Sequence, residues 1–259
     1  MIEWREAVSL FAGQLQRVLS EPGCPICRWV RRDEEAWIWH TLYECTGDPG
    51  VRSEFDSSHG FCHSHAHLMI EVTEKHHLGG SSVARMYETV VQSYREMLEV
   101  LHKPKSKLKQ WLSHECSTLL SERETKGCML CRASRRTARR AVSFLLQEIQ
   151  QGGDLWRARL HESDGLCNPH LTLALKNRLA REDRTLWQFL LEDHLRRLEE
   201  LEQQLFQLQR KQSYDVDEGI TPEEALSWQE AIWRFTGMKY GELLWRSNLE
   251  GIGRGQRSS

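Results

Sequence analysis

Two short cysteine motifs occur twice in this 259-residue chain, in the same order and with nearly the same spacing. The first copy pairs CPIC at residues 24–27 with GFCHSH at 60–65, and the second pairs CMLC at 128–131 with GLCNPH at 165–170. The two motifs are separated by 34 residues between their nearest cysteines in the first copy and by 35 in the second. Agreement in both motifs and in the interval indicates an internal duplication.

The repeated residues are of the types that bind soft divalent metal ions. A Cys-x-x-Cys pair lets two sulfurs converge on one ion, and a distant Cys-x-x-His pair completes a tetrahedral Cys3His shell, which is common in structural zinc sites. We therefore expect two metal sites, most readily two zinc ions, one in each repeat. Their ligands would be Cys24, Cys27, Cys62 and His65 in the first repeat, and Cys128, Cys131, Cys167 and His170 in the second.

Alternatives remain at these sites. His63 and His67 flank His65 and can each replace it, although the match to His170 favours His65. Three cysteines and a histidine also hold iron–sulfur clusters, but the spacing and the closed set of four ligands favour zinc. Cys45 and Cys116 have no counterpart in the other repeat, so we expect free thiols there, with a redox-reactive thiol as the alternative.

The residues around the motifs predict that each ligand pair opens a helix. Glycine precedes all four pairs closely, and the partial positive charge of a helix N-terminus favours thiolates. Arg28 and Arg132 directly follow the two Cys-x-x-Cys pairs and are placed to offset the negative charge of three thiolates. Since each ion would join helix starts that are distant in the chain, binding should contribute to folding.

The apolar residues elsewhere in the chain recur at helical spacing, and the alternation typical of strands is missing, which predicts an all-α fold. Two stripes step by three or four residues: Met86, Val90, Tyr94, Met97 and Leu101, and Leu191, Leu195, Leu198, Leu201, Leu205 and Leu208. We expect both stripes to pack within the core. A coiled-coil seam is the alternative and would make a homodimer.

The duplication and the prolines suggest four segments. The first metal-binding repeat covers residues 1–103, a connecting helix lies within 104–125 (Leu108 to Glu122), and the second repeat covers 126–213. The last segment, 214–259, contains a helix that Thr221-Pro222-Glu223-Glu224 opens, with an N-cap followed by proline at the first helical position, and that stops at Gly237. Its final residues, GIGRGQRSS, are expected to be disordered.

The composition limits the partners and the location. Lysine and arginine number 35 against 37 aspartates and glutamates, so the net charge does not demand a nucleic-acid partner or a membrane. No apolar run is long enough to cross a bilayer, and the N-terminus is charged and amphipathic, unlike a signal peptide. We expect a cytoplasmic protein, in which eight cysteines serve as metal ligands or free thiols rather than disulfides.

The chain resembles DUF6062, a bacterial family of unknown function whose members pair CPxC with GFCxxH and then repeat the arrangement as CxxC with GFCxPH. The resemblance covers nearly the whole chain, including the closing segment SYDVDEGITPEEALSWQEAIWRFTG. The departure is Leu166, where the family usually has phenylalanine. The resemblance implies the two metal sites and implies no activity.

The functional hypothesis that follows is a zinc-binding helical scaffold for protein interaction or regulation. The expected ligand shells are closed, and the chain has no phosphate-binding loop or nucleophile elbow, so we assign no catalytic residues and do not expect an enzyme. Ten tryptophans can fill the core or build a partner surface, and we expect most to fill the core. One alternative is an iron–sulfur or thiol redox protein. Another is nucleic-acid binding through Arg132, Arg135, Arg136, Arg139 and Arg140, although pairing with acidic helices or plain solvation is favoured there.

Overall fold

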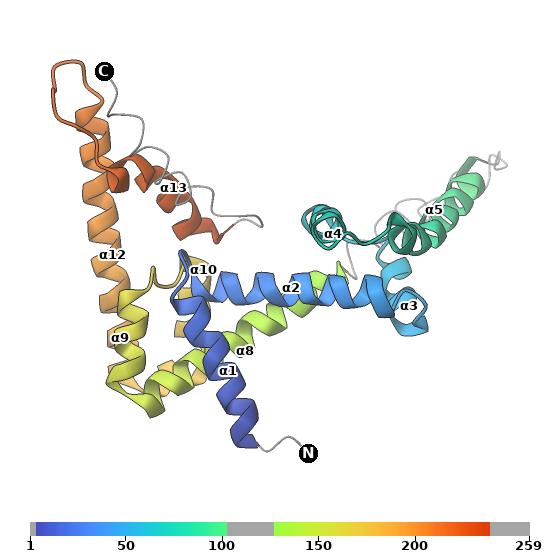
Figure 1. Ribbon diagram of the computed structural model, residues 1–259, viewed down its shortest axis with the longest axis horizontal. Helices are drawn as coiled ribbons and strands as arrows, with labels where there is room; N and C mark the ends of the chain where they lie inside the picture. The colour runs from blue at the N-terminus through green and yellow to red at the C-terminus, as the bar shows by residue number, and fades with distance from the viewer. Residues whose placement is uncertain (1–3, 103–126, 239–259) are drawn as a thin grey trace, which may run out of the picture. The chain divides into compact units, whose positions relative to one another are not determined.

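The computed structural model describes residues 4–102 and 127–238, and within them it contains eleven helices and no strand (Figure 1). The helices are α1 (Trp4–Leu19), α2 (Pro25–Glu44), α3 (Pro49–Ser57), α4 (His63–Lys75), α5 (Gly80–His102), α8 (Met129–Gly152), α9 (Asp154–Glu162), α10 (Asn168–Leu175), α11 (Arg178–Glu182), α12 (Arg184–Lys211) and α13 (Pro222–Thr236). The all-α prediction is confirmed. The expected connecting helix, the C-terminal tail and Cys116 lie outside the described residues.

The chain forms two compact units that combine parts of both sequence repeats. Unit 1 comprises residues 1–31 and 137–259, and unit 2 comprises residues 32–136. The helices α2 and α8 each begin in one unit and end in the other. The compact units are therefore divided differently from the segments 1–103, 104–125, 126–213 and 214–259 suggested by the duplication.

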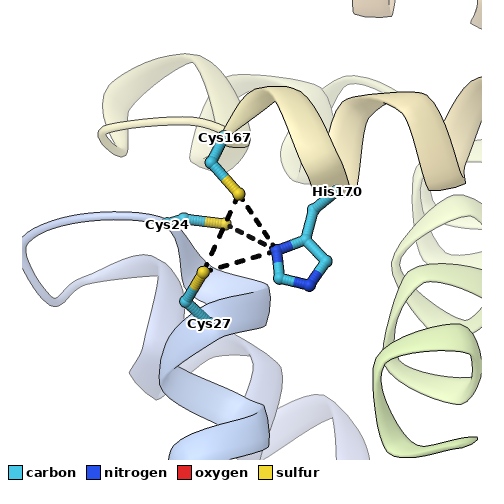
Figure 2. Close-up of side chains that lie close together, drawn as sticks. All are labelled: Cys24, Cys27, Cys167 and His170. Carbon is cyan, nitrogen blue, oxygen red and sulfur yellow. Dashed lines mark hydrogen bonds between the residues drawn. The ribbon is translucent and has the colours of Figure 1, made fainter. Parts of the chain in front are cut away.

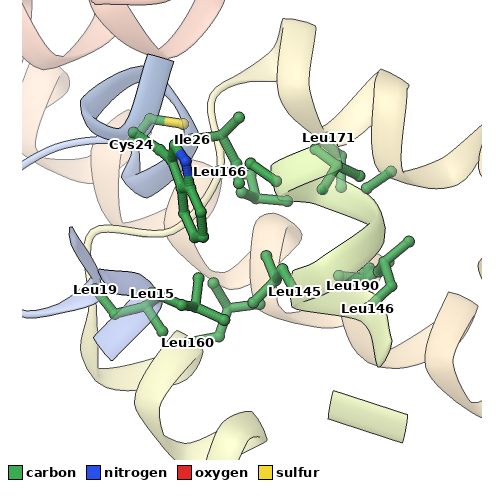
Figure 3. Packing of buried hydrophobic residues seen from close by; sticks show 14 of the residues in the cluster. Leu15, Leu19, Cys24, Ile26, Leu145, Leu146, Leu160, Leu166, Leu171 and Leu190 are labelled. Atoms are coloured by element: carbon green, nitrogen blue, oxygen red, sulfur yellow. The ribbon is translucent and has the colours of Figure 1, made fainter. Parts of the chain in front are cut away.

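The core of unit 1 is built from side chains of α1, α2, α8, α9, α10 and α12 (Figure 3). Leu15 from α1, Ile26 from α2 and Leu145 and Leu146 from α8 are fully buried in it. Cys24 belongs to the same cluster, so this thiol lies against the apolar core. A ligand-type residue fixed in a packed interior has little freedom to move, because protein cores are close-packed.

The core of unit 2 is centred on aromatic rings from α3 and α5 and the loop before α4. Phe55 makes edge contacts with Phe61 and Tyr87, with ring centroids 5.0 and 5.1 Å apart. Leu68 of α4 and Met86 of α5 are fully buried beside them in the same unit. Edge-to-face pairs of this kind add to the energy of apolar burial.

The start of α13 has the capping arrangement that its sequence predicted. The Thr221 hydroxyl accepts a hydrogen bond from the backbone of Glu224, and the Glu224 carboxylate accepts one from the backbone of Thr221. Pro222 occupies the first turn, where a missing N–H costs nothing. The helix then packs against α12 and α10.

The apolar stripes are only partly buried, which corrects the expectation that both of them pack within the core. On α12 the buried positions include Leu186, Leu190 and Leu201, whereas Leu195 of the predicted stripe is 55% exposed. Asp193, His194 and Arg197 are buried on the same helix because hydrogen bonds satisfy them. On α5 the stripe is buried at Met86 and Val90, exposed at Tyr94 and half-buried at Met97.

None of the helices within residues 4–102 and 127–238 combines the length and the hydropathy that a membrane-spanning helix requires.

Candidate metal centres

Four of the predicted ligands converge within unit 1, and we call this cluster centre 1 (Figure 2). It consists of Cys24, Cys27, Cys167 and His170, whose ligand atoms all lie within 4.8 Å of one another. The Nδ1 atom of His170 lies 3.5, 3.4 and 3.1 Å from the sulfurs of Cys24, Cys27 and Cys167. The sulfurs of Cys27 and Cys167 are 3.8 Å apart.

The other four predicted ligands converge within unit 2, and we call this cluster centre 2. It consists of Cys62, His65, Cys128 and Cys131, again with all ligand atoms within 4.8 Å of one another. The Nδ1 atom of His65 lies 3.2, 3.6 and 3.3 Å from the sulfurs of Cys62, Cys128 and Cys131. The sulfurs of Cys62 and Cys131 are 3.6 Å apart. Both centres therefore have the same donor set and similar dimensions.

The prediction that each repeat completes its own site is wrong. The Cys-x-x-Cys pair of the first repeat meets the Cys-x-x-His pair of the second, and the reverse holds for the other two pairs. The packing of unit 1 gives the reason for centre 1. Cys24 and Ile26 at the start of α2 share a buried cluster with Leu166 and Leu171 around the start of α10. Apolar contact thus joins the two halves where the ligands meet.

The prediction that the ligand pairs open helices is confirmed. The helices α2 and α8 begin directly after Cys24 and Cys128, and Cys62 and Cys167 are the N-cap residues of α4 and α10. Neither N-cap side chain makes a capping hydrogen bond to its helix. These sulfurs therefore point at the other ligands instead of at backbone N–H groups.

Glycines with positive φ turn the chain into each Cys-x-x-His pair. Gly60 has φ +86° and Gly165 has φ +70°, values that other residues adopt only with strain. A β-carbon at Gly165 would lie 2.4 Å from Nε of Arg197, and one at Gly60 would lie 2.9 Å from the Tyr87 ring. Both the backbone and the neighbouring side chains therefore require glycine at these two positions.

The clustering of thiols perturbs their ionisation strongly. In centre 2, burial opposes ionisation of Cys128, but hydrogen bonds from His65 and from the backbone lower its pKa to about 6. Burial and the charge of Cys128 raise the pKa of Cys131 to about 12. In centre 1, burial opposes ionisation of Cys24, but hydrogen bonds from Cys167, Cys27 and His170 lower its pKa, while the hydrogen bonds with Cys167 and Cys24 raise the pKa of Cys27. Ionisation of one thiol thus disfavours ionisation of its neighbours, and a cation would offset the repulsion between the thiolate charges.

Two buried arginines hold the loop that carries Cys167. Arg197, 7% exposed, donates to the backbone oxygens of Leu160, His161 and Ser163 and pairs with Asp193. These carbonyls lie at the end of α9 and just beyond it.

Arg234 of α13, 1% exposed, donates to the backbone oxygens of Asp164 and Leu166 in the same loop. Since buried guanidinium groups need partners, the loop and the two arginines stabilise one another.

The residue that follows α13 and Gly237 contacts centre 1 directly. The backbone N–H of Met238 donates to the sulfur of Cys27 at 3.4 Å. The thioether of Met238 accepts a hydrogen bond from the backbone N–H of Cys24 at 3.1 Å. Backbone donors to a thiolate stabilise its charge, so the end of α13 belongs to the surroundings of this centre.

The arginines after the Cys-x-x-Cys pairs act on the turns that precede those pairs. Arg28 donates to the backbone oxygen of Pro22, and Arg132 donates to that of Gly127, each at 2.8 Å. Arg132 also pairs with Glu54 of α3. The two repeats thus use the same arginine in the same way, and its positive charge lies within one turn of the thiolates.

The two histidines that flank His65, and Cys45, lie outside the two clusters. His63 and His67 are exposed and contact each other, with ring centroids 4.5 Å apart, while His65 is buried in centre 2. Cys45 lies 3.5 Å from Nε2 of His40 at the end of α2 and has no part in either cluster.

Sequence reasoning missed two residues that contact the clusters. Glu34 lies behind His65 on α2, and Met238 follows α13 beside Cys27. The only sequence signal for Glu34 is a difference between the repeats, because the corresponding residue in the second repeat is Ala138. Nothing in the sequence marks Met238, which contacts Cys27 through its backbone and Cys24 through its thioether.

The fold and the two clusters define an all-helical protein with a pair of Cys3His groups suited to metal ions. A family model described as a family of unknown function, DUF6062, matches residues 16–227. The chain therefore belongs to the DUF6062 family, as its motifs indicated. No curated protein and no solved structure matches it.

Proposed function

We propose that this protein is a zinc-binding helical scaffold in which each ion joins helices from the two halves of the chain. The observation that carries the proposal is the convergence of four donors in each centre. Zinc–sulfur bonds of about 2.3 Å in a tetrahedron separate sulfurs by about 3.8 Å. The sulfurs of Cys27 and Cys167 are 3.8 Å apart and those of Cys62 and Cys131 are 3.6 Å apart, which agrees with that value.

The same distances weigh against the iron–sulfur alternative. A cluster distributes its cysteine ligands over several iron atoms, which keeps most of the sulfurs further apart than the ligands of a single ion. Here one nitrogen lies within 3.6 Å of all three sulfurs of its own centre. Single ions with mixed sulfur and nitrogen donors favour zinc over harder metals.

The closed donor set supports a structural role for the ions rather than a catalytic one. Catalytic zinc sites usually have three protein ligands and leave the fourth position to water, whereas each centre here offers four protein ligands. The ligands come from helix starts more than a hundred residues apart in centre 1 and more than sixty apart in centre 2. An ion that closes such long loops stabilises the folded chain.

The interaction role is supported by the outer face of α13. Trp228, Ile232 and Phe235 lie at helical spacing and are 50%, 57% and 59% exposed. The buried residues of the same helix are Glu224, Ser227, Trp233 and Arg234, so three of the four are polar. Most amphipathic helices show the opposite arrangement, and an exposed apolar face is typical of a protein-binding surface.

Elemental analysis of the purified protein, together with its visible spectrum, tests the metal assignment. We expect two zinc ions per chain and a colourless sample. Removing the ions with a strong chelator should melt helices, which far-UV circular dichroism would detect. A brown, iron-containing sample would contradict zinc, and full helicity after complete metal removal would contradict the structural role.

A second candidate, polyanion binding by α8, is favoured by one observation. Arg135, Arg136, Arg139 and Arg140 are exposed, and within the described residues none forms an ion pair with a carboxylate. Among the residues that the structure describes, the ion pairing expected from the sequence therefore occurs at Arg132, with Glu54, and not at the other four arginines. Salt-dependent binding of duplex DNA and RNA by the parent and by a double variant, Arg135→Glu with Arg139→Glu, tests this role. Equal binding by the parent and the double variant would contradict a polyanion-binding role of α8.

A further inference from the structure

A buried carboxylate lies behind the histidine of centre 2. Oε1 of Glu34 is 3.1 Å from Nε2 of His65, the ring nitrogen opposite the one that contacts the sulfurs. The exposed fractions of the two side chains are 1% and 3%. The hydroxyl of Ser134 on α8 donates to the same carboxylate oxygen. The carboxylate, the imidazole and the three sulfurs therefore form one continuous polar group in the interior of unit 2.

The duplication supplies an internal comparison, because centre 1 lacks this arrangement. The residue that corresponds to Glu34 in the second repeat is Ala138, and the one that corresponds to Ser134 in the first repeat is Val30. Both are buried in the apolar cluster of unit 1. Among the described residues, no side chain forms a hydrogen bond with Nε2 of His170, which is only half-buried.

We propose that Glu34 is a positioning residue for the metal of centre 2, an inference that rests on the proposed metal-binding function. By accepting a hydrogen bond from Nε2 of His65, the carboxylate fixes the tautomer that presents Nδ1 to the ion. It also makes the imidazole a stronger donor, as carboxylate–histidine pairs do at other zinc sites. A carboxylate buried near three thiolates is otherwise unfavourable, and a divalent cation explains its position.

Equilibrium competition with a chelator tests this role at each centre separately. The zinc-loaded full-length protein is incubated with graded chelator, its free thiols are alkylated, and mass spectrometry reports the modification of each cysteine. For Glu34→Gln we expect the chelator concentration that half exposes Cys62, Cys128 and Cys131 to fall about 10-fold or more. The value for Cys24, Cys27 and Cys167 should stay that of the parent. Glu34→Ala should have a larger effect than Glu34→Gln, because the amide oxygen can still accept a hydrogen bond.

Glu35→Gln is the matched control. Glu35 follows on the same helix, pairs with the exposed Lys75 and belongs to neither cluster. This variant loses one negative charge at the neighbouring position, so it should leave both chelator midpoints unchanged. If it shifts the midpoint of centre 2 as much as Glu34→Gln does, the effect is one of net charge and the proposal is wrong.

A spectroscopic measurement separates positioning from a merely structural role. The protein loaded with cadmium-113 should give two NMR resonances, one for each Cys3His centre. Glu34→Gln should shift one resonance and leave the other in place, because only one imidazole loses its carboxylate. A shift of neither resonance, or an equal loss of protection at both centres, would overturn the role of Glu34. A parent protein that binds no metal would overturn the proposed function as well.

Discussion

Centres 1 and 2 use the same four donor types at nearly the same distances, but their surroundings differ. Centre 2 has a buried histidine held by the carboxylate of Glu34. Centre 1 has a half-buried histidine for which the described residues provide no such partner, and its cysteines instead contact the backbone and thioether of Met238. The loop that carries Cys167 is fixed by the buried Arg234. A duplicated sequence has therefore kept its ligands and diverged around them.

The difference shows that motif spacing determines the ligand set, whereas helix packing determines the residues that support it. A Cys3His shell needs particular side chains at particular spacing, which a short motif can encode. The residues that orient those ligands come from whichever helix packs nearby. In unit 1 these are α12 and α13, and in unit 2 they are the middle of α2 and the start of α8. A substitution of a residue that supports one centre should therefore weaken metal binding at that centre and leave the other centre intact.

The largest effect is expected from loss of a ligand, and it also tests the exchange of ligands between the repeats. We expect Cys24→Ser to reduce the zinc content from two ions to one per chain. Cys27 and Cys167 should then react with an alkylating reagent, while Cys62 and the other thiols of centre 2 stay protected.

Mass spectrometry of the alkylated peptides, with elemental analysis, measures both results. Cys62→Ser is the matched variant and should expose Cys128 and Cys131 instead. If Cys24→Ser exposed Cys62, the ligands would be grouped within each repeat, and the structure of centre 1 would be wrong.

The sequence allowed the helical class and the eight residues of the two Cys3His groups to be predicted, because both leave a local signal. Helical periodicity and the spacing of Cys24 and Cys27 are properties of one segment. The grouping of the ligands is not local. Each repeat offers one Cys-x-x-Cys and one Cys-x-x-His pair, so either grouping gives two complete shells. The choice depends on which helices pack together, as Leu166 and Ile26 do in unit 1.

The buried polar residues could not be predicted for a similar reason. The leucine stripe on α12 predicted that Leu195 faces the core, yet Arg197 occupies the buried face. An arginine is buried only where enough acceptors meet it, and three of the acceptors of Arg197 are backbone oxygens of a distant loop. Backbone acceptors carry no sequence signature.

The next largest effect is expected from Arg197→Met, which removes a buried cation and leaves Asp193 and three carbonyls without that donor. Breaking a buried ion pair from one side costs about 3 kcal/mol or more. Chemical denaturation should show this loss in unit 1, and centre 1 should lose zinc to a chelator more readily than in the parent.

Arg178→Met is the control for Arg197→Met. Arg178 pairs with Glu182 at the surface of unit 1 and is 84% exposed, so this substitution should cost less than about 1 kcal/mol. An equal effect of the two substitutions would show that the buried network does not support the Cys167 loop.

Alanine substitutions at three glycines beside the two centres should destabilise the protein to different extents. Gly165→Ala should cost about 2 kcal/mol or more, because its positive φ adds to a contact with the anchored side chain of Arg197. Gly60→Ala should cost somewhat less, since the new β-carbon would lie 2.9 Å from the Tyr87 ring, further than the 2.4 Å to Arg197 at Gly165. Gly127→Ala should cost about 1 kcal/mol, because its φ is positive but no atom of the described residues lies within 4 Å of the new β-carbon. Denaturant midpoints of the zinc-loaded variants measure the order, and a reversal of Gly165 and Gly127 would contradict the packing described here.

The smallest effect is expected from Met238→Leu, which keeps the apolar volume and removes the thioether that accepts from Cys24. The Cys24 N–H loses a weak acceptor, while the Met238 backbone N–H can still reach Cys27, so the cost should be about 1 kcal/mol. Half-exposure of Cys24, Cys27 and Cys167 should then require a several-fold lower concentration of chelator, with the thiols of centre 2 unchanged. Loss of protection at centre 2 alone would contradict the contact between Met238 and centre 1. Paired with Glu34→Gln, this variant sharpens the comparison, because each substitution weakens one centre through a residue for which the described part of the chain has no counterpart at the other.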